Sequence, residues 1–183
     1  AFILYNFLGF DKAQLVFSSM SGPLKVTREG DLITLDFPVI RPERFNDYPD
    51  GLKEALGVNE LVGVYLGRDL LVEVPAEKDV QGARPDFTAI KKLGYKIILT
   101  APGNQVDFVS RFFAPTYGVD EDPVTGSAHS QLIPFWSEKL GKKKMEAKQL
   151  SRRGGTLKVE QLDGRVLMGG KCVFYMKGEF ELP

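Results

Sequence analysis

Residues 127–140 constrain the fold of this chain more than any other stretch. Their apolar members cover more than one side of the helix that the sequence predicts here: Ala128, Leu132, Ile133, Phe135, Trp136 and Leu140. A helix that is apolar on several sides has to be surrounded by protein. Gly141 is a natural helix stop, whereas Pro134 removes one backbone donor and predicts a kink or a break in the hydrogen bonding. We therefore expect a buried central helix.

Short strand-like runs separated by glycine-containing turns fill most of the remaining sequence. They lie at residues 14–18, 24–28, 32–37, 62–66, 70–74, 96–100, 106–113, 144–151, 156–162, 165–168 and 172–177. Short helices are predicted at residues 50–56 and 85–93. An apolar helix followed by a strand meander occurs twice along the chain, which indicates two similar α+β units.

The first of these helices is predicted at residues 1–8, which are apolar on every side. The run is too short to span a bilayer, and no basic segment precedes it as in a signal peptide. It is typical of a helix that belongs in a protein core. Because no polar lead-in or cap precedes it, we expect the chain to have lost its N-terminal part, which leaves the first α+β unit incomplete.

Charge and cysteine content exclude several functional classes. Lys plus Arg and Asp plus Glu number 24 each, so no overall field favours nucleic acid or an anionic membrane. The single cysteine, Cys172, excludes an internal disulfide and a cysteine-rich zinc site, and it favours a reducing, intracellular setting. We interpret Cys172 as a buried small hydrophobe in a late strand rather than a nucleophile. The phosphate-binding patterns GxGxxG and GxxxxGK[ST] are absent from the sequence.

Chemistry is most plausible where the loop at residues 120–126 enters the central helix. The first turn of a helix offers unpaired N–H groups and the positive end of the dipole, which can hold a carboxylate. Gly126 would allow a ligand close to the backbone, and Asp122 stands beside this cradle as an acid or base. Thr125 or Ser127 could equally cap the helix, and capping is the commoner role of such residues. The residues alone leave both alternatives open.

Other polar residues give weaker signals. His129, the only histidine, could shuttle a proton or simply pack. Residues 142–144 are three lysines after the helix end, where they complement the dipole on a solvated face. Arg152 and Arg153 could reach an anionic ligand or form a surface turn. No set of residues has metal-ligand spacing, so no metal is expected.

Several linked motifs resemble the phenazine-biosynthesis-like (PhzF) isomerase family in order and spacing. They occupy residues 107–115, 121–129, 135–136, 140–143 and 149–155, with looser matches at 21–24 and 67–71. The resemblance implies an α+β fold of the diaminopimelate epimerase type, in which two similar domains each wrap strands around a central helix. The expected domains are residues 1–40, the remainder of the first, and 41–183, the second, with a C-terminal strand that can return to the first.

The resemblance also implies a cofactor-free isomerase, usually a cytoplasmic homodimer, which transfers a proton on a small carboxylate-bearing metabolite in the cleft between the domains. No nucleic-acid or membrane partner is implied. The matching catalytic positions are Asp122 and Ser127, and the substrate-binding positions are Thr125, Gly126 and Ala128. Family members carry their general acid/base glutamate before the point where this chain begins, so this chain alone is expected to be inactive. The alternative is a non-catalytic member that binds a metabolite or a protein.

Overall fold

The computed structural model describes residues 1–20, 22–179 and 181. The helices are α1 (Phe2–Phe7), α2 (Leu52–Leu56), α3 (Glu77–Gly82), α4 (Phe87–Leu93), the 3-10 turn η1 (Pro115–Tyr117) and α5 (Gly126–Leu140). The strands are β1 (Gln14–Ser19), β2 (Gly22–Glu29), β3 (Leu32–Pro38), β4 (Glu43–Arg44), β5 (Gly63–Leu66), β6 (Leu70–Glu73), β7 (Ile97–Pro102), β8 (Phe108–Ala114), β9 (Val119–Glu121), β10 (Lys144–Gln149), β11 (Gly155–Gln161) and β12 (Arg165–Lys171). Ser21, in the loosely matching stretch 21–24, lies outside the described residues.

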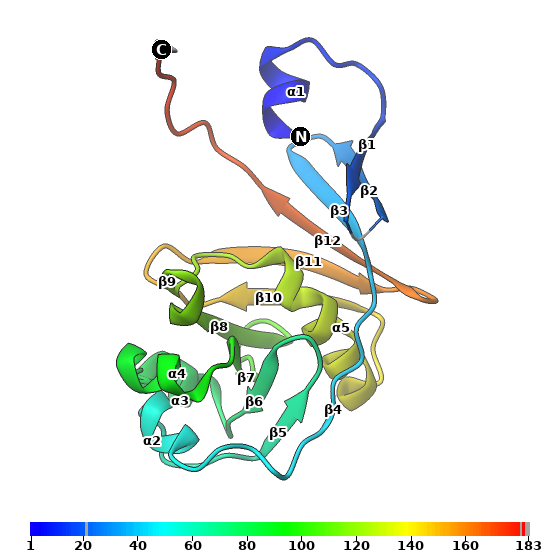
Figure 1. Ribbon diagram of the computed structural model, residues 1–183. Helices are drawn as coiled ribbons and strands as arrows, with labels where there is room; N and C mark the ends of the chain where they lie inside the picture. Colours follow the sequence, from blue (N-terminus) through cyan, green and yellow to red (C-terminus); the bar gives the residue numbers. More distant parts are fainter. Residues whose placement is uncertain (21, 180, 182–183) are drawn as a thin grey trace.

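The strands form one continuous sheet in the order β1-β2-β3-β12-β11-β10-β8-β7-β6-β5-β4, with β9 beside β8. The β1-β2-β3 meander is antiparallel, as predicted, and it occupies the upper part of Figure 1 together with α1. Two pairings are parallel, β6 with β7 and β8 with β10. A parallel pair needs a crossover connection, and α3 with α4 provides the first and α5 the second.

Helix α5 is the buried central helix that the sequence predicts. Every residue from Ala128 to Trp136 is buried, and its apolar side chains share a core with residues of β7, β8 and β10–β12. The helix ends at Gly141, whose φ of 63° lies in the left-handed region that glycine adopts without strain. The prediction of an α+β fold around a buried helix is therefore confirmed.

Pro134 leaves one backbone carbonyl of α5 without its helical partner, and this carbonyl binds the segment between β3 and β4. The proline has no N–H to donate to the carbonyl of Ser130, four residues earlier. The backbone N–H of Ile40 donates to that carbonyl instead, at 2.9 Å. The segment that leads from β3 to β4 is thereby attached to the middle of the helix.

A second core lies on the other face of β5–β8, under α2, α3 and α4. Of these helices, α2 and α4 correspond to the predicted helices at 50–56 and 85–93. Helix α3 was not predicted from the sequence; it begins where Asp79 Oδ2 accepts a hydrogen bond from the backbone N–H of Ala76, 3.0 Å away.

Two predictions about the ends of the described chain are wrong. Helix α1 forms, but none of its residues is buried. It packs on the small cluster of Leu15, Val26 and Ile33, and the centroid of the Phe7 ring lies 4.7 Å from that of the Phe174 ring. The predicted strand at 172–177 is absent, and Cys172 is exposed rather than buried. Strand β12 pairs with β3 only as far as Lys171 opposite Leu32, where β3 begins. The tail beyond Lys171 therefore has no neighbouring strand in the described structure.

Candidate functional site

The start of α5 has a different hydrogen-bonding pattern from the expected helix cap. Thr125 is the N-cap residue, but its side chain does not bond to an amide of the first turn. Its hydroxyl donates to Asp122 Oδ2 instead, at 2.6 Å. No hydrogen bond from a described side chain caps the amides of Gly126, Ser127 and Ala128. The first turn thus keeps the unpaired donors and the positive dipole end that an anion requires.

Asp122 and Ser127 are both half-buried next to these amides. The backbone N–H of Asp122 donates to the carbonyl of Phe112 at 3.0 Å, which continues the pairing of β9 with β8. Among the described residues, Asp122 Oδ1 and the Ser127 hydroxyl have no hydrogen-bond partner. One carboxylate oxygen and one hydroxyl therefore remain available to a ligand.

Gln149, at the end of β10, fixes the loop between these two residues. Its Oε1 accepts from the backbone N–H of Thr125 at 2.8 Å, and its Nε2 donates to the carbonyl of Asp122 at 2.7 Å. The same Nε2 lies 3.2 Å from Thr125 Oγ1. Since Gln149 is fully buried, these bonds are shielded from water. The residue belongs to a motif noted in the sequence, but no local pattern predicts this role for it.

Two further contacts hold the loop on either side. Arg111 forms a bidentate pair with Glu121, with Nε to Oε1 at 2.7 Å and Nη2 to Oε2 at 3.0 Å. Its Nη1 donates to the carbonyls of Val80 and Ala83, so it also completes the end of α3. Ser151 Oγ donates to the carbonyl of Pro123 at 2.7 Å. The loop that carries Asp122 is therefore bonded to β8, β10 and the segment after β10.

Gly126 and Ala128 can meet a ligand only through their backbones. A Cβ added to Gly126 would lie 3.5 Å from Met168 Sδ and 3.8 Å from Leu35 Cδ1, so protein atoms occupy that direction at normal contact distance. The Ala128 side chain is 1% exposed and belongs to the core. The predicted binding role of these two residues is therefore confined to their amides.

His129 is a buried core residue rather than an exposed proton shuttle. Its Nδ1 lies 2.8 Å from the carbonyl oxygen of Thr125, so Nδ1 carries the proton. Its Nε2 is buried and has no partner among the described residues. Burial lowers the pKa of His129 from 6.5 to about 4, only partly opposed by the bond to Thr125. The imidazole is neutral at physiological pH.

None of the remaining candidates forms a hydrogen bond or ion pair with residues 120–129 in the described structure. Lys142 pairs with Asp107 at 2.6 Å and Lys144 with Glu160 at 3.6 Å, which agrees with a solvated face. Arg152 and Arg153 are exposed. No group of three or more metal-ligating residues occurs in the described part of the chain. None of the described helices combines the length and hydropathy that a membrane-spanning helix needs.

Cavities also lie elsewhere in the described part of the chain, and two of them involve the central sheet or α5. One of about 590 Å³ lies between β2–β3 and β10–β12, and one of about 300 Å³ lies beside the second half of α5. Neither is lined by residues 122–129. The candidate site is consequently a helix start with its adjoining loop, and these two cavities are separate features.

A sheet around a buried helix is the architecture of the diaminopimelate epimerase-like class of α+β proteins, and the superposition of solved PhzF-family structures on this chain places it in that class. Within that class the chain belongs to the phenazine biosynthesis-like (PhzC-PhzF) family, whose sequence profile matches residues 1–178. The resemblance seen in the motifs is thereby confirmed.

Individual relatives agree with this assignment. An uncharacterised isomerase of Pseudomonas aeruginosa is 43% identical over all of this chain, which spans 70% of that protein. Phenazine biosynthesis-like domain-containing protein 2 of Mus musculus is 43% identical over 90% of this chain and 64% of its own length. The crystal structure of a PhzF-family phenazine biosynthesis protein of Enterococcus faecalis superposes with a TM-score of 0.93 at 43% identity, covering 99% of this chain and 70% of that one.

Proposed function

We propose that this chain contributes part of the active site of an isomerase that transfers a proton on a small carboxylate-bearing metabolite. Membership of the PhzF family supports isomerase chemistry. The observation that carries the proposal is the uncapped first turn of α5 beside a half-buried Asp122 with one unpaired oxygen. The site requires no metal or organic cofactor for this step.

In this proposal the substrate carboxylate binds to the amides of Gly126, Ser127 and Ala128, and the Ser127 hydroxyl donates to it as well. These donors are held in place before the substrate arrives, so binding does not require the loop to reorganise. Asp122 lies next to the bound carboxylate. Its Oδ2 accepts the hydrogen bond from the Thr125 hydroxyl, and its Oδ1 has no partner among the described residues. A glutamate outside this chain would take the proton from one carbon and return it to another, and Asp122 would support that transfer.

Deuterium incorporation from D₂O tests the role of Asp122 directly. The full-length protein would be incubated with small unsaturated carboxylates, including a dihydro-hydroxyanthranilate, and incorporation followed by NMR. We expect Asp122→Ala to slow exchange roughly 100-fold or more, because loss of a general acid/base group has effects of that order. Ser127→Ala should act mainly on KM, by about tenfold, which corresponds to one lost hydrogen bond.

Asp120→Ala is the matched control, because Asp120 is an exposed aspartate in β9, two residues before Asp122. It should exchange deuterium at the wild-type rate. An Asp122→Ala protein that turns over an identified substrate at the wild-type rate would contradict the assigned role of Asp122.

One observation favours a second candidate function, metabolite binding without catalysis. Near the start of α5, Glu121 is paired with Arg111 and His129 is buried and neutral. In the described residues around this helix start, Asp122 is thus the carboxylate with an unpaired oxygen. If the full-length protein lacks a second acid/base group, the uncapped turn would bind a carboxylate without isomerising it, and calorimetry would detect binding with no deuterium exchange.

A further inference from the structure

The cavity of about 300 Å³ beside the second half of α5 is a separate feature that the proposed function does not use. It is lined by Arg41, Pro42, Arg44, Tyr65, Pro134, Phe135, Glu138 and Lys139. Its volume is at the lower end of the range of small-molecule sites. It lies in the part of α5 after Pro134, whereas the proposed active site is at the start of the helix.

The walls of this cavity are fixed by the backbone. The Ile40 N–H bonds to the Ser130 carbonyl that Pro134 leaves free, and this bond places Arg41 and Pro42 against the helix. On the other side, Arg44 and Tyr65 are paired across β4 and β5. Two prolines with a fixed φ stiffen the rim. The cavity is therefore formed without a ligand, which favours binding of a small molecule.

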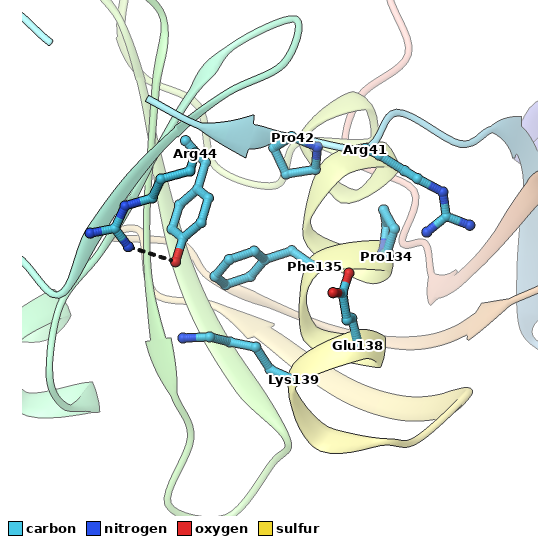
Figure 2. Close-up of a pocket in the computed structure, with 8 residues that line it drawn as sticks. Arg41, Pro42, Arg44, Pro134, Phe135, Glu138 and Lys139 are labelled. Atoms are coloured by element: carbon cyan, nitrogen blue, oxygen red, sulfur yellow. Dashed lines mark hydrogen bonds between the residues drawn. The ribbon is translucent and has the colours of Figure 1, made fainter. Parts of the chain in front are cut away.

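Aromatic and cationic groups converge on one side of the cavity. Tyr65 and Phe135 meet edge to face, with ring centroids 4.8 Å apart. Arg44 donates to the Tyr65 hydroxyl at 3.2 Å and lies over the Tyr65 ring, and Lys139 Nζ lies 5.1 Å from the Phe135 centroid. Figure 2 shows Arg44 and Lys139 on one side of the Phe135 ring, and Arg41 with Glu138 on the other.

The charged side chains that line the cavity determine which ligand charge it favours. Lys139 is neutralised by its ion pair with Glu73. Among the described residues, Arg41, Arg44 and Glu138 form no ion pair. Two unpaired guanidinium groups against one carboxylate leave the cavity with excess positive charge. Guanidinium binds carboxylates bidentately, and Tyr65 and Phe135 offer apolar ring surface beside it.

We infer that this cavity is a second ligand site, which binds a small aromatic carboxylate. The carboxylate pairs with the Arg44 guanidinium beside the Tyr65 hydroxyl, and the ring packs against Phe135. Glu138 and Arg41, on the other side of the ring, contribute less. Because this site shares no residue with the start of α5, the inference does not depend on the proposed isomerase activity.

Titration of the protein with sodium benzoate at constant ionic strength, followed by amide chemical shifts, tests the inference. We expect saturable shifts at the backbone of Arg44, Tyr65 and Phe135. Arg44→Gln should weaken binding at least tenfold, and Tyr65→Phe should weaken it about threefold because the guanidinium loses its hydroxyl partner. Benzylamine and benzyl alcohol should not saturate the site in the same range.

Arg41→Gln is the matched control, since it removes an arginine from the far side of the same cavity, and we expect less than a threefold effect. Arg44 is exposed, so Arg44→Gln should leave the fold intact, and an unchanged melting temperature would verify this. Equal binding by wild type and Arg44→Gln, equal binding of benzylamine, or shifts confined to residues 126–128 would each overturn the inference. The last result would place benzoate at the proposed active site instead.

Discussion

His129 is a titratable residue that packs in the core and does not act as a proton shuttle. Nothing in its sequence position distinguishes a proton shuttle from a packed side chain, because both occur in the first turn of a helix. Its burial in the core under α5 decides between them. His129 therefore makes the stability of the folded protein, and not a reaction at this residue, depend on pH.

Stability should therefore fall as the pH is lowered through the range from 6.5 to 4. The pKa of His129 is about 4 in the folded protein and near 6.5 when unfolded, so the unfolded chain binds the proton first. The contribution is fully present above pH 6.5 and declines below it by up to about 1.4 kcal/mol per pH unit. Urea unfolding of wild type and His129→Leu at several pH values measures it. Parallel pH profiles of the two proteins would contradict the assignment.

Gln149 does not contact the proposed ligand, but its loss should disturb the candidate site strongly. Gln149→Leu keeps the volume but leaves the Thr125 N–H and the Asp122 carbonyl without their partner. We expect a loss of about 1–3 kcal/mol in the free energy of unfolding, together with faster amide hydrogen exchange at Thr125. Gln81→Leu, at an exposed position of α3, is the control and should change neither. Unchanged exchange at Thr125 would show that Gln149 does not hold the loop.

At the scale of elements, the sequence predicted those whose pattern is local. Short stretches of sequence are enough to predict the buried helix α5, its end at Gly141 and the meander β1-β2-β3. Helix α3 and strand β9 were missed because they are short and because the contacts that Arg111 makes with both come from β8, a distant part of the sequence. The tail at 172–177 has an apolar strand-like composition, but whether a strand forms depends on a neighbour. Strand β3 begins at Leu32, opposite Lys171, so it provides no partner for the residues after Lys171.

Arg111 joins β8, β9 and the end of α3 through one planar guanidinium. Lysine has the charge but not the geometry to make these bonds together. We expect Arg111→Lys to lower the free energy of unfolding by about 2–3 kcal/mol, because its half-buried partners lose their donors. Arg165→Lys is the matched control: Arg165 also binds a carboxylate, that of Asp36, but is more exposed than Arg111, and its substitution should cost about 1 kcal/mol or less. Equal effects of both substitutions would contradict the central role of Arg111.

At the scale of the whole molecule, the motifs predicted the family and the fold class, and the resemblance allowed a C-terminal strand to return to the first domain. Strand β12 returns to pair with β3, so the sheet runs without interruption across the proposed boundary between residues 1–40 and 41–183. The candidate site was predicted in its position, at the start of α5, but not in its supports. Gln149, Ser151 and Arg111 come from other elements, and no local pattern joins them to Asp122.

We propose that the first turn of α5 binds the carboxylate of the substrate. A crystal structure of the full-length protein with a bound carboxylate metabolite tests it most directly. We predict a carboxylate oxygen within hydrogen-bond distance, about 2.7–3.2 Å, of the amides of Gly126–Ala128, with Asp122 beside the reacting carbon. A carboxylate bound elsewhere, with these amides covered by a protein side chain, would contradict the account.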